Sequence, residues 1–227
     1  MSDDSTTEPA PPGAWEVLAR GAIGALLGVV AGLGFPLTDR SARREWYLFA
    51  SIGLFLGGLA GLAGFVERLG AGRRLRRQLG LTLLLLLGSS AWGLASIFQA
   101  EWTRLVLQGG PEGARAGIQT YLDYLVERPA FFARLFLPLG AFVAAPALVR
   151  MRGGGWRAQL LVAAPASLGL AALVAEDGDM RALLLILGPG LLIASGLSAW
   201  AAGALARRRG RSTPTDEASA PGAGDPT

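Results

Sequence analysis

Long uncharged apolar runs alternate with short charged segments along this chain. Runs without Asp, Glu or Arg cover residues 21–38, 46–66, 78–100, 158–175 and 182–206. A helix rises about 1.5 Å per residue, so about 20 residues cross the roughly 30 Å hydrocarbon core of a bilayer. An ordinary soluble domain would not supply five runs of this length. The pattern therefore predicts transmembrane helices.

A sixth apolar run is shorter and less regular. Residues 135–149 hold no charge, and an extension back to Phe131 includes Arg134. An arginine near the end of a membrane helix can extend its side chain to the headgroups, so we interpret residues 131–149 as a span. The alternative is a re-entrant or interfacial segment. The six predicted spans cover residues 17–37, 46–66, 78–100, 131–149, 158–175 and 182–206.

The predicted fold class is an all-α integral membrane protein. It is a bundle of six transmembrane helices within residues 14–209, with a glycine-lined N-terminal helical hairpin and a short interfacial amphipathic helix. Residues 1–13 and 210–227 are rich in Pro, Ser, Thr, Ala, Gly and acids, and we expect disordered tails there. The acidic start lacks the basic region of a signal peptide, so we interpret the first span as retained.

The arginines indicate an orientation for this bundle. All 21 basic residues are arginine, and thirteen of them fall on the side of the membrane that holds both termini, against eight on the other side. The positive-inside rule therefore predicts cytoplasmic termini. Three arginines in the loop at residues 38–45 conflict with this, and the alternative is a first span that does not cross. The Ala-, Gly- and Leu-rich, lysine-free composition is typical of a GC-rich bacterium, so we expect the bacterial cytoplasmic membrane.

Glycines recur at spacings of three and four in the first two spans. The second pattern reverses the first, as matching depths in an antiparallel pair require. Such spacings place glycines on one helix face, where backbones approach closely in lipid. The pattern predicts a hairpin with a glycine zipper; the alternative is that this face contacts another span or a second copy. The predicted level pairs are Gly21–Gly64, Gly24–Gly61, Gly28–Gly57 and Gly32–Gly53.

Two features of the second half indicate further structure. Prolines at 138, 146, 165 and 189 are expected to kink their helices, which marks either a binding cavity or irregular packing. Residues 114–127 predict an amphipathic helix stopped before Pro129, which either covers a cavity as a lid or connects two spans at the bilayer surface. The sequence therefore predicts a cavity or a kink at Pro138, Pro146, Pro165 and Pro189.

The residue types that are missing exclude much chemistry. Without His, Cys or Lys, the chain has no catalytic triad, thiolate metal site or Schiff base. We therefore expect no catalytic residue, no cofactor and no metal. The basic pI of about 10.5 also suggests nucleic acid, but the arginines flank apolar runs, so the expected partner is the lipid bilayer and no nucleic acid. Glu67 is expected to pair with Arg20 at similar depth.

These features favour a non-enzymatic polytopic membrane protein. We expect a structural, accessory or assembly subunit of a bacterial membrane complex, with other membrane subunits or a second copy as further partners. The alternative is a small transporter or permease subunit for an uncharged or weakly polar solute, with its site among the proline-bearing spans.

Overall fold

The computed structural model of the chain describes residues 12–38, 46–175 and 178–211, and these residues form helices and no strand. The all-α class is thus confirmed. The predicted tails lie outside the described residues except at positions 12, 13, 210 and 211, as does most of the arginine-bearing loop at residues 38–45. The elements are α1 (Ala14–Thr38), α2 (Trp46–Gly70), α3 (Leu75–Glu127), α4 (Pro129–Met151), α5 (Trp156–Ala158), the π-helical η2 (Gln159–Ala163), α6 (Ala164–Val174) and α7 (Gly178–Arg211).

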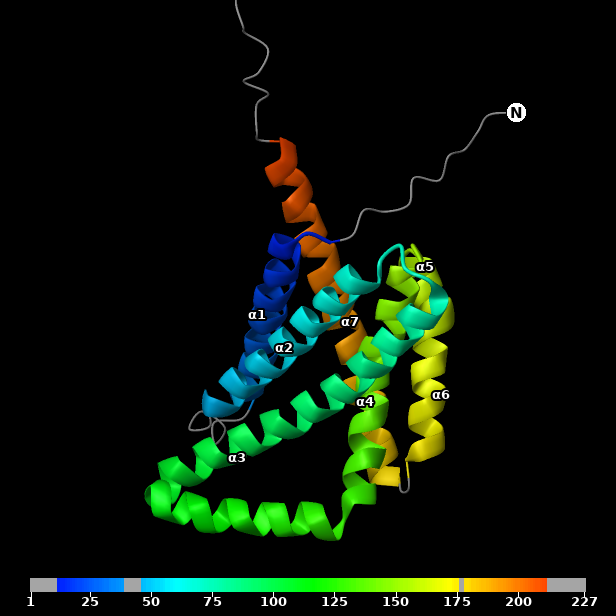
Figure 1. Cartoon of the computed structure of the whole chain (residues 1–227). Helices are drawn as coiled ribbons and strands as arrows, with labels where there is room; N and C mark the ends of the chain where they lie inside the picture. The colour runs from blue at the N-terminus through cyan, green and yellow to red at the C-terminus, as the bar shows by residue number, and fades with distance from the viewer. Residues whose placement is uncertain (1–11, 39–45, 176–177, 212–227) are drawn as a thin grey trace, which may run out of the picture.

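Six helical rods are long and apolar enough to cross a membrane: α1, α2, α3, α4, the continuous α5–η2–α6 and α7. A helix pairs every backbone N–H and C=O group within its own segment, which an apolar run needs in a bilayer because no water is present there to pair with them. Successive rods run in opposite directions (Figure 1). The start of α1, the end of α7 and the α2–α3 and α4–α5 turns consequently share one end of the molecule, here named the terminal end.

α3 changes direction at Gly110. This residue has φ +72° and ψ −179°, a conformation essentially restricted to glycine, and Pro111 follows it without a backbone donor. α3 therefore has a crossing limb (residues 75–109) and a return limb (residues 111–127), which runs across the opposite end toward α4 (Figure 1). The helix predicted over residues 114–127 is present, with Ala114 buried.

α4 lies at the centre of the packing, and ten of its 23 residues are buried. Phe142 and Ala147 have no exposed surface. The Phe142 ring packs directly over Gly188 of α7, and Phe136 packs over Gly93 of α3. Glycines on the neighbouring helices thus leave room for the large side chains of α4.

α1 and α2 pack backbone to backbone. A methyl group built on Gly28 would lie 2.6 Å from the carbonyl oxygen of Ile52, and one on Gly24 would lie 2.9 Å from that of Leu56. These distances are shorter than van der Waals contact. Any side chain at either position would therefore force the two helices apart.

Candidate functional site

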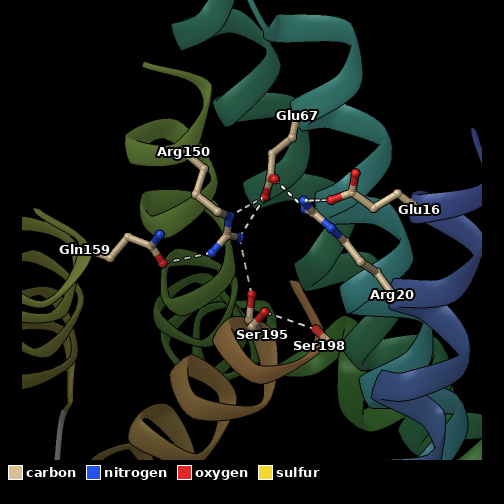
Figure 2. Close-up of polar contacts among 7 residues, drawn as sticks. All are labelled: Glu16, Arg20, Glu67, Arg150, Gln159, Ser195 and Ser198. Atoms are coloured by element: carbon tan, nitrogen blue, oxygen red, sulfur yellow. Dashed lines mark hydrogen bonds and ion pairs between the residues drawn. The ribbon is translucent and has the colours of Figure 1, made fainter. Parts of the chain in front are cut away.

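A cluster of buried charges joins three helices near the terminal end. Glu16 and Arg20 come from α1, Glu67 from the last turn of α2, and Arg150 from the last turn of α4 (Figure 2). The side chains of Arg20, Glu67 and Arg150 are 8%, 4% and 12% exposed. Charges as buried as these are stable only when they are paired.

Glu67 is the centre of this cluster. Its Oε2 accepts a hydrogen bond from Nη1 of Arg20, and its Oε1 accepts one from Nε of Arg150 at 2.7 Å. Nη2 of Arg150 lies 2.7 Å from the same oxygen. Arg20 also donates from Nη2 to Glu16 at 2.9 Å. The carboxylate of Glu67 therefore bridges α1 and α4, which lie on opposite sides of it (Figure 2).

Neutral side chains extend the cluster to two more elements. Nη1 of Arg150 donates to Oε1 of Gln159 in η2 at 3.0 Å, and Nη2 lies 3.4 Å from Oγ of Ser195 in α7. The hydroxyl of Ser198 donates to the backbone carbonyl of Ser195 at 3.0 Å. The guanidinium of Arg150 thus links α2, η2 and α7 to its own helix.

Gly64 makes room for the arginine of α1. A methyl group at Gly64 would lie 3.0 Å from Cδ of Arg20, so this glycine lets the side chain pass along α2 toward Glu67. Nε of Arg20 is buried and has no hydrogen-bond partner among the described residues. The ion pairs are thus made at the cost of one unsatisfied donor.

The chemistry of this cluster is that of a clamp. Two carboxylates and two guanidinium groups sum to zero charge, and each carboxylate has an arginine partner. Over the described residues, no three acidic side chains gather as metal ligands would.

The pairing of Arg20 with Glu67 is confirmed, while Arg150, Gln159 and Ser195 were missed. In the sequence, Arg150 follows the fourth span and indicates only membrane topology. A charge directly at the end of an apolar run, facing Glu67 in another such run, was the signal that could have identified it. Gln159 and Ser195 gave a weaker signal, because single polar residues are common in membrane helices.

The predicted packing glycines lie along the α1–α2 contact, but in a different register. Gly21 approaches Gly57 and Gly61 instead of Gly64, and Gly28 approaches Gly53 instead of Gly57. The offset is about one helical turn. Level pairing was the wrong assumption, because a residue on one helix fits between residues of its neighbour and Gly64 is covered by Arg20. The surroundings of Gly32 lie outside the described residues.

The four prolines occupy different environments. Pro138 and Pro146 are buried within α4, Pro189 lies partly buried inside α7, and Pro165 is exposed at the start of α6. The π-helical turn η2 carries Gln159 and ends two residues before Pro165.

A small pocket lies between α2, α4 and α7, with room for about one water molecule. Its lining includes none of the four prolines: it is formed by Leu56, Leu59, Ala60, Val143, Leu191, Ala194 and Ser195.

Comparison with known proteins gives no relative for this arrangement. The chain matches no protein-family model, no curated protein and no solved structure.

Proposed function

We propose that this chain is a non-enzymatic integral membrane protein that serves as a structural or assembly subunit of a membrane complex. The main observation in support of this proposal is the cluster around Glu67, in which buried acidic and basic side chains from different helices pair with one another. A catalytic or binding site leaves polar groups free to face its substrate. Here the acidic and basic groups hold helices together instead.

Packing supports the same proposal. The backbones of α1 and α2 touch at their glycines, and we interpret this contact as a glycine zipper, a typical way for membrane helices to associate without a hydrophobic driving force. The pocket between α2, α4 and α7 is too small for an organic solute. Large apolar side chains point outward instead, among them Leu26, Val30 and Leu173, which are 63%, 58% and 86% exposed.

The proposed setting is the bacterial cytoplasmic membrane, with both termini in the cytoplasm. The terminal end carries most of the arginines, as expected for a cytoplasmic side. In this setting the return limb of α3 lies along the outer surface, where Tyr121 and Tyr124, each 37% exposed, would meet headgroups. The bilayer and neighbouring membrane subunits are the partners, and nucleic acid is not.

The test compares a deletion strain with strains that carry the wild type or Glu67→Gln. A genuine partner is a membrane protein that co-purifies in mild detergent, falls in abundance on deletion, and recovers with the wild type but not with the variant. The purified chain in liposomes should leave the permeability to glycerol and urea unchanged. Solute flux through those liposomes, or a full-length chain found in the soluble fraction, would overturn the proposal.

A further inference from the structure

Two turns at the terminal end are fastened side by side. Nε2 of Gln78, which is 4% exposed, donates to the carbonyl oxygens of Gly70 and Met151, both at 3.1 Å. Gly70 ends α2 and Met151 ends α4, and the side chain of Met151 packs directly against Gly70. One buried amide thus holds the α2–α3 turn beside the α4–α5 turn.

These joined turns present a strongly basic surface, here named the arginine face. Its seven members are all exposed: Arg68, Arg73, Arg74, Arg76, Arg77, Arg152 and Arg157. The nearest acid in sequence, Glu67, is buried and paired with Arg20 and Arg150, so it neutralises none of them. The other acids between residues 46 and 175 lie from position 101 to 127, on the far part of α3 (Figure 1). Among the described residues, none of these seven arginines forms an ion pair with an acid, so the arginine face is positively charged there.

Exposed apolar side chains border the arginine face directly. Leu75 and Leu79 in the first turns of α3 are 50% and 49% exposed, and Leu161 is 77% exposed. Trp156 is 66% exposed, and the guanidinium of Arg157 lies 5.5 Å from the centre of its ring. Tryptophan at the border between charged and apolar surface is typical of the headgroup region of a bilayer. A nucleic acid or an acidic peptide in solution would bind the arginines but would leave the neighbouring leucine side chains in contact with water.

We propose that the arginine face binds the phosphate headgroups of anionic phospholipids. The arginines contact the phosphates while the leucines below them contact the acyl chains of the same lipids. Gln78 gives the surface its shape, since it holds arginines from two separate turns within reach of one lipid cluster. This inference rests on the membrane placement proposed above and adds a lipid preference to it.

The experiment measures binding of phosphatidylglycerol in mixed micelles to the full-length chain in neutral detergent, with phosphatidylcholine as the reference lipid. The test variant combines Arg73→Gln, Arg76→Gln and Arg152→Gln. The control combines Arg115→Gln, Arg128→Gln and Arg181→Gln, which removes equal charge from exposed positions near the opposite end. Tryptophan fluorescence melts establish that both variants are folded.

The wild type should bind phosphatidylglycerol in preference to phosphatidylcholine. Each arginine near the headgroups contributes about fivefold in affinity, so the test variant should bind on the order of a hundredfold more weakly. The control should keep nearly all of the affinity. The inference is overturned if both variants weaken equally, if neither does, or if inorganic phosphate or a short RNA displaces the lipid. In each of these cases the proposed subunit function stands, because its own test measures partner abundance and solute flux.

Discussion

Replacing Glu67 with glutamine should destabilise the whole bundle. The substitution keeps the size and one acceptor oxygen of the side chain but removes the negative charge that Arg20 and Arg150 share. Both guanidinium groups are at most 12% exposed, so bulk water cannot replace the lost partner. Hydrogen bonds to charged groups contribute about 1.5–3 kcal/mol each, and loss of one partner of a buried pair costs about 3–5 kcal/mol. We expect a loss of about 3 kcal/mol or more.

The assay is thermal unfolding of the purified chain in detergent, followed by fluorescence of its six tryptophans. For a chain of this length, 3 kcal/mol corresponds to a fall in Tm on the order of 10 °C. The matched control is Glu101→Gln, which makes the same chemical change in the ion pair with Arg104, where the glutamate and arginine side chains are 14% and 36% exposed. Water reaches this arginine when its partner is lost, and exposed pairs contribute about 1 kcal/mol at most, so this control should lose much less stability than Glu67→Gln.

A double variant tests the mechanism. Arg150→Gln added to Glu67→Gln restores zero net charge in the cluster, so it should be less destabilised than the sum of the two single changes. A Glu67→Gln protein that melts with the Glu101→Gln control, or strictly additive single changes, would refute the reasoning that these charges hold the helices together.

Three further outcomes are expected. Gly28→Leu should lower the melting temperature and separate α1 from α2, whereas Gly88→Leu, where a side chain meets no atom within 4 Å, should not; equal melting of the two would contradict the backbone contact. Gly110→Ala should cost about 1–3 kcal/mol, because its φ of +72° with extended ψ strains any side chain, and proteolysis near the kink should rise; an unchanged digestion pattern would count against it. The hydrogen bond from Arg104 holds the pKa of Glu101 below its usual value, so its stabilisation is present above about pH 4.5 and is lost as the pH falls. Amide protection factors near the kink, which are corrected for the intrinsic pH dependence of exchange, should therefore fall at acid pH, and a fall only at alkaline pH would contradict the reasoning.

The helices were predictable because their signal is local. Each apolar run forms a helix regardless of its neighbours. The helix ends are less local, because α3 and α7 continue through charged residues beyond the predicted spans. The helix over residues 114–127 was equally predictable from the sequence, since its apolar spacing and Pro129 lie within a single segment. Prediction of the number and order of the apolar helices therefore needed no knowledge of packing.

Contacts between helices were harder to predict. The α1–α2 register depends on how side chains fit between one another, and the path of Arg20 over Gly64 changes which glycines meet. The role of Arg150 depends on α4 reaching the end of α2, a placement that no local pattern encodes. The hydrogen bond from Arg150 to Gln159 likewise depends on where the π-helical turn near Pro165 lies relative to α4.

The order in which the bundle is synthesised bears on the clamp at Glu67. When α1 and α2 leave the ribosome, Glu16, Arg20 and Glu67 already bring their charges together, and these sum to one negative charge. The positive charge that completes the set, Arg150, arrives more than eighty residues later, at the end of α4. In the nascent hairpin, the Glu67 carboxylate therefore lacks its second guanidinium partner until α4 packs against α2. A chain truncated before that point would leave the Glu67 carboxylate without its second guanidinium partner.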